Sequence, residues 1–276
     1  MRTQAEKAAA FRALHEEPGT FIIPNPWDAG TARLLASFGF KALATTSLGL
    51  ANIHGRGTVS ADEIIDNCRM IAAATDLPTN GDLENCGADE PEAAAEMIRR
   101  ASEAGCVGGS IEDYTGDPAN PIYGFNLAVE RVYAAVEMAK SLPIPFVLTA
   151  RAEALIHGSV DLDDTIKRLQ AFEQAGADVL YAPGLKDLET IRTVVSSVTK
   201  PVNVVMTHAD PSITAADLAA LGVKRISVGG SLSRFVLNAF MGAAREMAER
   251  GAFTFVGGNP PWKELLDQFS KGSSVP

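Results

Sequence analysis

The chain has 276 residues, a length that fits one large domain and is common among α/β barrels. Hydrophobic residues make up 46%, and the formal net charge of −10 argues against nonspecific binding to nucleic acid or to an anionic membrane. An anionic substrate would therefore need a local positive centre, such as a metal ion or an arginine. Three cysteines in no paired pattern indicate a reducing, cytoplasmic setting without a disulfide framework.

In chain order, the sequence predicts short apolar strands that alternate with amphipathic helices. Residues 1–17 have a helical pattern without the apolar core of a signal peptide, and no apolar run approaches the roughly 18 residues of a membrane span. The expected strands are 21–23, 41–45, one within 78–85, 107–111, 145–150, 178–181, 201–205 and 225–228. The expected helices follow them, ending near 38, then at 60–74, 91–104, 127–140, 161–175, 187–197, 214–221 and 232–250, with a short one from about 262.

Eight strand–helix pairs without a linker predict a single (β/α)8 TIM barrel over residues 1–276, with extra N-terminal and C-terminal helices. Ala-Gly turns such as Ala175-Gly176 fit helix ends that lead into buried parallel strands. A doubly wound open sheet is the alternative, but no Gly-x-Gly-x-x-Gly follows the first strand. Gly229-Gly230, after the eighth strand, is only a weak indication of phosphate binding.

The most informative stretch is 78–85, which reads as a strand that runs into two acids. Asp82 and Glu84 are two residues apart, so on a strand both side chains would point to the same side. Neighbouring carboxylates repel each other unless a cation lies between them, and a hard divalent cation such as Mg²⁺ takes oxygen ligands. A solvated strand end with a chance Asp-x-Glu is the alternative.

Further polar residues follow the other predicted strands, at the end of the barrel where barrel enzymes place their chemistry. Three acids and an inward arginine at one mouth favour a functional site. Glu153 has a competing interpretation as the carboxylate that simply holds Arg151, and His157 is expected to be a loop histidine outside the site. The residues concerned are Thr45, Thr46, Ser47, Leu48, Gly49, Asp82, Glu84, Glu112, Asp113, Arg151, Glu153, His157 and Asn203.

From about residue 21 to residue 250, the chain resembles the isocitrate lyase and phosphoenolpyruvate mutase superfamily. Five runs carry the resemblance, and the last three, in this order on these strands, are specific. They are Pro24-Asn25-Pro26-Trp27-Asp28-Ala29-Gly30, Thr45-Thr46-Ser47, Asp82-Leu83-Glu84-Asn85, Ser110-Ile111-Glu112-Asp113 and Thr149-Ala150-Arg151-Ala152-Glu153.

The resemblance implies an enzyme that uses Mg²⁺, or Mn²⁺ in its place, on a small 2-oxo or 2-hydroxy acid. In similar enzymes the acid matching Asp82 binds the metal, and those matching Glu84 and Glu112 hold its waters. Residues matching Ser47-Leu48-Gly49 bind a substrate carboxylate, and the arginine matching Arg151 binds the substrate's oxygens. The metal stabilises an enolate as a C–C or P–C bond breaks. We therefore expect Arg151 and Glu112 to be catalytic, and Thr45 and Asn203 to join the substrate-binding residues.

Three departures from the family pattern limit this expectation. The related lyases carry a lid with Lys-Lys-Cys-Gly-His, whereas residues 114–125 here contain no cysteine. The mutases have an aspartate in the loop after the second strand, which here reads Ala51-Asn52-Ile53-His54-Gly55-Arg56-Gly57. Cys86-Gly87-Ala88 replaces a Gly-Tyr-Gly after the metal acids. Cys86 is expected to be a bystander, and Cys68 and Cys106 to pack in the core.

Three functions remain open. The first is a Mg²⁺-dependent lyase or C–C hydrolase acting on a small 2-oxo or 2-hydroxy (di)carboxylic acid with a proton donor other than cysteine. The second is a phosphonate enzyme of the phosphoenolpyruvate mutase or phosphonopyruvate hydrolase kind. The third is a non-catalytic binder of 2-oxo acids. The sequence favours the first.

The last long helix predicts a homo-oligomer, a dimer of dimers and hence a homotetramer. Its apolar residues cover a wider arc than one barrel-facing stripe requires, and exposed apolar patches mark interfaces. Similar proteins swap this helix between subunits, so residues from about 232 to 276 are candidates for exchange. The alternative is a helix folded back on its own barrel. The residues are Leu232, Phe235, Val236, Leu237, Phe240, Met241 and Met247.

Overall fold

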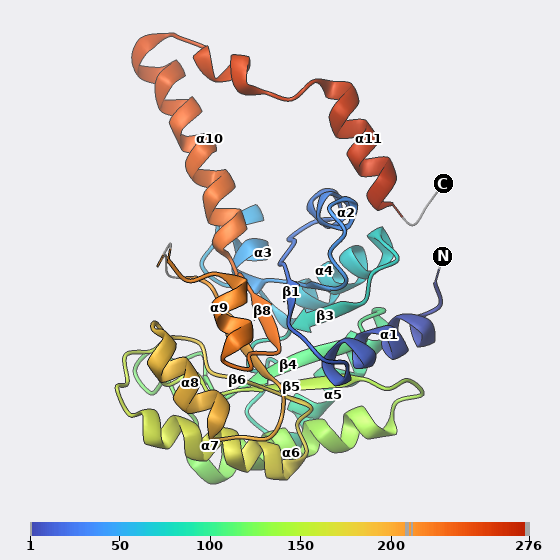
Figure 1. The fold of residues 1–276 in the computed structure, drawn as a ribbon, viewed down its shortest axis with the longest axis vertical. Helices are drawn as coiled ribbons and strands as arrows, with labels where there is room; N and C mark the ends of the chain where they lie inside the picture. The colour runs from blue at the N-terminus through green and yellow to red at the C-terminus, as the bar shows by residue number, and fades with distance from the viewer. Residues whose placement is uncertain (1, 208–209, 211, 274–276) are drawn as a thin grey trace.

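A computed structural model describes residues 2–207, 210 and 212–273, and these form the predicted barrel (Figure 1). Eight parallel strands follow the order β1-β8-β7-β6-β5-β4-β3-β2. The circle is completed between β1 and β2 by one backbone bond, from Ala44 N to Pro24 O at 3.1 Å. The strands are β1 (Phe21–Ile23), β2 (Leu43–Ala44), β3 (Thr79–Asp82), β4 (Gly108–Glu112), β5 (Val147–Arg151), β6 (Val179–Tyr181), β7 (Val202–Val205) and β8 (Arg225–Ser227).

Helices surround the barrel, and most of them begin at the residues that the sequence indicates. Ser60 caps the fourth helix through a capping box with Glu63, and Asp161 caps the seventh. The helices are α1 (Gln4–Glu16), α2 (Ala29–Ser37), α3 (Ser47–Ile53), α4 (Ala61–Ala74), α5 (Pro91–Glu103), α6 (Phe125–Ser141), α7 (Leu162–Ala175), α8 (Leu188–Ser196), α9 (Ala215–Ala220), α10 (Ser231–Arg250) and α11 (Trp262–Gly272), with a 3₁₀ turn at Thr254–Gly258. None of the helices that these described residues form has the length and apolar character needed to cross a membrane.

The N-terminal helix α1 closes the barrel at the end where the strands begin. Phe11 is fully buried and packs with Val107, Val147 and Val179, which lie at the starts of three neighbouring strands. Burying a side chain of this size contributes roughly 1.5–3 kcal/mol. The other end of the barrel, where the strands finish, is left for the functional residues.

Two local features differ from the sequence expectation. Ser47–Ile53 forms the short helix α3, although part of this segment reads as a loop. Gly49 lowers helix propensity, but a Cβ there would lie 2.9 Å from the Cβ of Trp27, so close packing explains the glycine. The strand β3 ends at Asp82, and Glu84 has a left-handed φ of 51°. The prediction that Asp82 and Glu84 share a strand face is therefore wrong.

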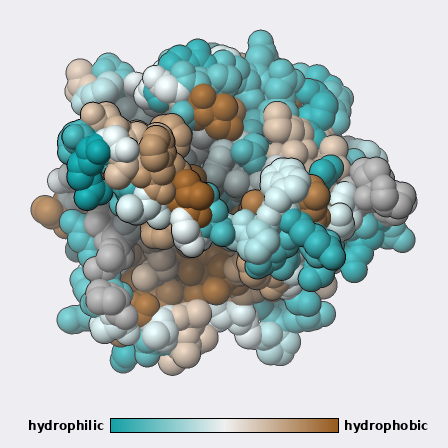
Figure 2. Space-filling view, turned by 90° about the horizontal axis from the view of Figure 1, so that it is seen from above, coloured by the Kyte–Doolittle hydropathy of each residue, from teal (hydrophilic) through white to brown (hydrophobic). Residues whose placement is uncertain are grey.

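The helix α10 leaves the barrel, and α11 returns beside α2 (Figure 1). Only Ser233 of α10 is buried, whereas Phe235 and Phe240 are 72% and 68% exposed. Figure 2, which looks down on this end of the molecule, shows hydrophobic side chains among hydrophilic ones at the surface. The alternative of a helix folded back on its own barrel is thus not what the structure shows.

Candidate functional site

A cavity of about 230 Å³ opens where the strands end and extends into the barrel. Among the described residues that line it, Asp82, Arg151 and Arg225 are the charged ones. Its volume equals that of roughly seven water molecules and lies below the roughly 300–1,000 Å³ of drug-sized ligand sites. The cavity therefore suits a small organic acid. Polar lining residues include Asn25, Thr45, Thr46, Ser47, Asn80, Ser110, Tyr181, Asn203 and Ser227.

Arg151, at the end of β5, is the centre of the acidic cluster. Its guanidinium contacts three carboxylates: Nη1 lies 2.8 Å from Asp82 Oδ1, Nη2 lies 3.1 Å from Glu112 Oε2, and Nε lies 2.7 Å from Glu153 Oε1. The guanidinium carbon also lies 4.8 Å from the centre of the Tyr181 ring. The sequence prediction that these strand ends converge is confirmed for these side chains, as is the alternative that Glu153 holds Arg151.

Asp82 is held in a fixed orientation from the neighbouring strand end. Its Oδ2 accepts hydrogen bonds from Ser47 N at 2.9 Å and Ser47 Oγ at 3.0 Å. Its own backbone N–H donates to Thr45 Oγ1 at 2.8 Å. The Thr45-Thr46-Ser47 segment thus positions a carboxylate, which the sequence alone did not indicate.

Glu84 and Glu112 lie beside Asp82. Glu112 ends β4, whereas Glu84 lies in a turn after β3 and not on the strand itself. The backbone carbonyl of Glu84 accepts a hydrogen bond from Glu112 N at 3.2 Å, which ties the turn after β3 to β4. Burial, and then the nearby charge of Asp82, raises the pKa of Glu84. Burial raises the pKa of Glu112 well above its usual range, while the ion pair with Arg151 opposes that rise.

The carboxylates around Arg151 offer oxygen ligands to a divalent cation. No three Asp, Glu, His or Cys side chains within residues 2–207, 210 and 212–273 are arranged to hold a metal ion together. Arg151 lies between Asp82 and Glu112, so each carboxylate faces a guanidinium instead of the other. The donor set still fits Mg²⁺, which takes one or two carboxylates directly and keeps several waters. Asp82, which Ser47 orients, would make the direct bond, with Glu84 and Glu112 beside it.

A second layer of ion pairs fixes the backbone of the site. Asp113 Oδ1 accepts from Glu153 N at 2.7 Å, and Asp113 Oδ2 lies 3.1 Å from Arg168 Nη1. Arg168 also donates to Tyr123 O at 3.0 Å, at the end of the lid segment. Burial raises the pKa of Asp113 to about 6. Asp113 is thus a supporting residue, and Arg168 is one that sequence reasoning missed because it lies in the middle of a helix.

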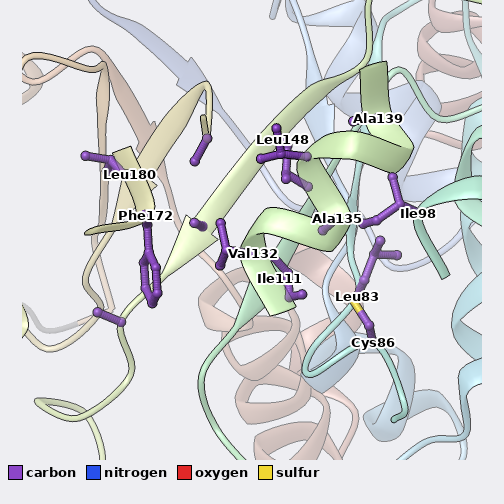
Figure 3. Packing of buried hydrophobic residues seen from close by; sticks show 14 of the residues in the cluster. Leu83, Cys86, Ile98, Ile111, Val132, Ala135, Ala139, Leu148, Phe172 and Leu180 are labelled. Atoms are coloured by element: carbon purple, nitrogen blue, oxygen red, sulfur yellow. The ribbon is translucent and has the colours of Figure 1, made fainter. Parts of the chain in front are cut away.

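The loop that follows Asp82 and Glu84 is held by Arg131 of α6, which the sequence also gave no reason to select. Its guanidinium donates to the backbone carbonyls of Asn85 and Asp89, at 2.5 and 2.7 Å, and stacks over Tyr123. Cys86, in this loop, is buried beside Leu83 (Figure 3). Burial raises the pKa of the Cys86 thiol to about 12, in agreement with a bystander role.

The structure separates the predicted substrate-binding residues into two groups. Thr45, Ser47 and Leu48 line the cavity near its mouth, whereas Gly49 packs against Trp27. Two of the three backbone amides of residues 47–49 are already engaged: Ser47 N by Asp82, and Gly49 N by Thr46 Oγ1.

Asn203 and His157, two further residues considered from the sequence, lie away from the mouth of the cavity. Asn203 lies deep in the barrel, where its Oδ1 accepts from Arg225 Nε at 2.8 Å. His157 does not line the cavity, and its ring stacks on Tyr114 with centroids 4.0 Å apart. Arg225 itself is a cavity residue for which the sequence gave no signal.

Comparison with known proteins identifies the family of this chain. The family model for phosphoenolpyruvate phosphomutase matches residues 11–248. A candidate lyase/mutase from Burkholderia cenocepacia J2315 has a solved structure that is 54% identical, covers 97% of this chain and 96% of its own, and superposes with a TM-score of 0.94. A candidate phosphonomutase from the same organism is 31% identical over 87% of this chain and 100% of its own, with a TM-score of 0.79.

A curated relative extends the comparison to lyases. The 2-methylisocitrate lyase of Escherichia coli (strain K12) is 29% identical over 230 residues, which cover 78% of this chain and 75% of the relative. The match of the family model spans most of the chain and includes every strand of the barrel. The chain therefore belongs to the phosphoenolpyruvate phosphomutase family, within the isocitrate lyase/phosphoenolpyruvate mutase superfamily.

Proposed function

We propose that the chain is a Mg²⁺-dependent lyase or C–C bond hydrolase that acts on a small 2-oxo or 2-hydroxy (di)carboxylic acid. The observation that carries this proposal is Arg151, a cation with 15% of its side chain exposed, which Asp82, Glu112 and Glu153 surround at the mouth of a cavity of small-acid size. The relationship to 2-methylisocitrate lyase favours cleavage of a C–C bond.

In this proposal the carboxylates around Arg151 bind the cation, and Arg151 binds the substrate. Asp82 would hold the cation directly, and Glu84 and Glu112 would hold its water ligands. When bound, Mg²⁺, or Mn²⁺ in its place, supplies Lewis-acid stabilisation of the negative charge that develops on the substrate oxygens. Arg151 donates hydrogen bonds to Asp82 and Glu153 and forms an ion pair with Glu112, which leaves N–H groups among its five for substrate oxygens. The planar guanidinium can then hold an enolate or a carboxylate at two points.

Glu153 and Tyr181 keep Arg151 in place while it does so. Glu153 is 3% exposed and accepts a hydrogen bond from Arg151 Nε, the guanidinium nitrogen nearest the backbone. Burial raises the pKa of Tyr181, so its hydroxyl stays neutral and can donate a hydrogen bond into the cavity. The lid segment 114–125 has no cysteine, so the proton that a lyase returns to its product would come from another group.

A turnover panel tests this function against its alternatives. Purified protein is incubated with Mg²⁺ and a set of 2-oxo and 2-hydroxy mono- and dicarboxylic acids, with phosphonopyruvate in parallel, and products are identified by NMR. We expect C–C cleavage of an acid that stops when EDTA is added. Release of phosphate and pyruvate from phosphonopyruvate alone would instead support the phosphonate enzyme. Binding of oxalate with Mg²⁺ but no turnover of any compound would support the non-catalytic binder.

We also infer that the protein is a homo-oligomer, a dimer of dimers in which α10 packs on a neighbouring subunit. The exposed side chains of α10 support this inference, because a monomer would leave Phe235, Phe240 and Met241 in water. Light scattering at low protein concentration tests it. Phe240→Glu is expected to reduce the mass of the assembly, with Glu249→Gln at the polar end of α10 as the control. A stable mass near 29.1 kDa for the unmodified chain would exclude the oligomer.

A further inference from the structure

Arg225 is a buried cation without an anionic partner among the described residues. It is 4% exposed and is the first residue of β8. Its guanidinium makes three hydrogen bonds, all with neutral groups: Nε to Asn203 Oδ1 at 2.8 Å, Nη2 to Thr149 Oγ1 at 3.0 Å, and Nη1 to His15 Nε2 at 3.5 Å. Two of its five N–H groups remain for another partner.

The charge state of this group is clear from its surroundings. Burial lowers the pKa of Arg225 to about 10, so it stays protonated at neutral pH. Burial, and then Arg225 itself, lowers the pKa of His15 to about 3. The His15 ring is therefore neutral, and with Nδ1 donating to Phe11 O at 2.8 Å, Nε2 acts as an acceptor. A full positive charge thus sits inside the barrel, balanced only by dipoles.

An unpaired buried charge is costly, and neutral hydrogen bonds recover only part of its lost hydration. Arg225 lines the same cavity as Asp82 and Arg151, so a bound anion could reach it. Arg225 is thus an incompletely satisfied donor in the wall of one small cavity.

The mouth of the cavity has the opposite balance of charge. Three carboxylates, those of Asp82, Glu112 and Glu153, contact the single guanidinium of Arg151, and the carboxylate of Glu84 lies nearby. One divalent cation would leave this group with a net negative formal charge. The mouth can therefore bind the reacting end of an anionic substrate only through the cation and Arg151. Its net negative charge offers little attraction to a second carboxylate of the substrate.

We propose that Arg225 forms a second anion subsite inside the barrel, which takes the second carboxylate of a dicarboxylic substrate while its 2-oxo or 2-hydroxy end lies at Arg151. Asn203 and Thr149 hold the guanidinium in position, and Arg225 is the residue that selects dicarboxylic over monocarboxylic acids. This inference rests on the proposed function of the same site. It adds the residue that determines the substrate class.

A matched pair of ligands tests the subsite by binding alone. Malate and 2-hydroxybutyrate are four-carbon 2-hydroxy acids that differ in a terminal carboxylate against a methyl group. Calorimetry with saturating Mg²⁺ is expected to show at least about tenfold tighter binding of malate. Tenfold corresponds to about 1.4 kcal/mol, which is within reach of hydrogen bonds to a charged group. Equal affinity for the two acids in the unmodified protein would overturn the proposal.

Variants at Arg225 then show whether this residue causes the preference for malate over 2-hydroxybutyrate. Arg225→Gln is expected to bring the two affinities to within about twofold by weakening malate and leaving 2-hydroxybutyrate unchanged, and Arg225→Lys to keep part of the preference. His15→Gln is the control, because His15 contacts Arg225 but does not line the cavity. An undiminished preference for malate in Arg225→Gln would contradict the proposal and leave Arg225 as a structural tie to α1.

A crystal structure of the unmodified protein with malate decides the question if Arg225→Gln fails to fold. The second carboxylate is expected within hydrogen-bond distance of Arg225, and a carboxylate elsewhere would overturn the proposal. Inorganic phosphate is titrated separately: Arg225-dependent phosphate binding that does not compete with malate would assign the subsite to a free inorganic anion instead. Because no turnover is needed, failure of this test is distinct from failure of the lyase assignment.

Discussion

The two arginines of the cavity show how differently one barrel treats buried positive charge. Arg151 ends β5 at the mouth and contacts three carboxylates, whereas Arg225 begins β8 near the opposite end and has three neutral partners. The mouth is an ion-pair network whose members can exchange partners when a cation or a substrate binds. The interior position holds a charge that no carboxylate of the described residues contacts. Our two proposals place metal and enolate chemistry at the mouth and recognition of a second carboxylate in the interior.

The largest expected effect comes from removing the Asp82 carboxylate from the ion-pair network at the mouth. Asp82→Ala is expected to abolish Mg²⁺ binding and turnover while leaving the fold intact, because Arg151 keeps Glu112 and Glu153 as partners. Calorimetry measures Mg²⁺ affinity, and thermal unfolding checks the fold. Asp66→Ala, which removes an exposed carboxylate paired with Arg69, is the control. Unchanged Mg²⁺ affinity in Asp82→Ala would rule out this role.

A smaller loss is expected when the guanidinium of Arg151 is replaced. Arg151→Lys keeps the charge but cannot contact three carboxylates and a substrate in one plane, so turnover should fall at least about tenfold. The ratio kcat/KM measures the loss, and the exposed Arg99→Lys serves as the control. Equal activity in Arg151→Lys would mean that the residue only pairs with Glu153.

The closed end of the barrel should respond to pH through stability. His15 takes up a proton near its ordinary pKa of 6.5 in the unfolded chain but only near 3 in the folded one, so its contribution to stability is present at neutral pH and is lost as pH falls through that window. Burial is the main cause of the lowered pKa of His15, and the positive charges of Arg225 and Lys224 lower it further. The effect is at most a few kcal/mol.

Chemical denaturation at several pH values checks this expectation. The difference in free energy of unfolding between the unmodified protein and His15→Gln should shrink from pH 7 to pH 4. A constant difference for His15→Gln across this range would contradict it.

The smallest expected effect is that of thiol alkylation. Cys68, Cys86 and Cys106 are buried, and the raised pKa of Cys86 keeps its thiol protonated at pH 8. Iodoacetamide should therefore leave activity unchanged, with mass spectrometry to confirm that the folded protein is unmodified. Complete inactivation that oxalate prevents would instead make Cys86 a residue of the site.

The barrel and much of the mouth could be predicted because strand order alone determines which residues meet. Parallel strands bring their ends together, so Asp82, Glu112 and Arg151 converge whatever the loops do. Glu84 could not be placed in this way. It lies past the end of β3 in a left-handed conformation, which a non-glycine residue adopts only where surrounding contacts impose it.

Residues that act from a distance along the chain gave no sequence signal. Arg131 and Arg168 are single arginines on amphipathic helices, where a surface position is the ordinary expectation. Arg225 begins a three-residue strand, and only the register of β7 and β8 shows that it enters the barrel beside Asn203. Such positions become visible only when three-dimensional neighbours are known.

A crystal structure of the unmodified protein with Mg²⁺ and oxalate, a mimic of an enolate, tests the central claim most directly. The account predicts Mg²⁺ bonded to Asp82, its waters held by Glu84 and Glu112, and oxalate oxygens within hydrogen-bond distance of Arg151. Mg²⁺ bound away from Asp82, or oxalate without a contact to Arg151, would contradict it.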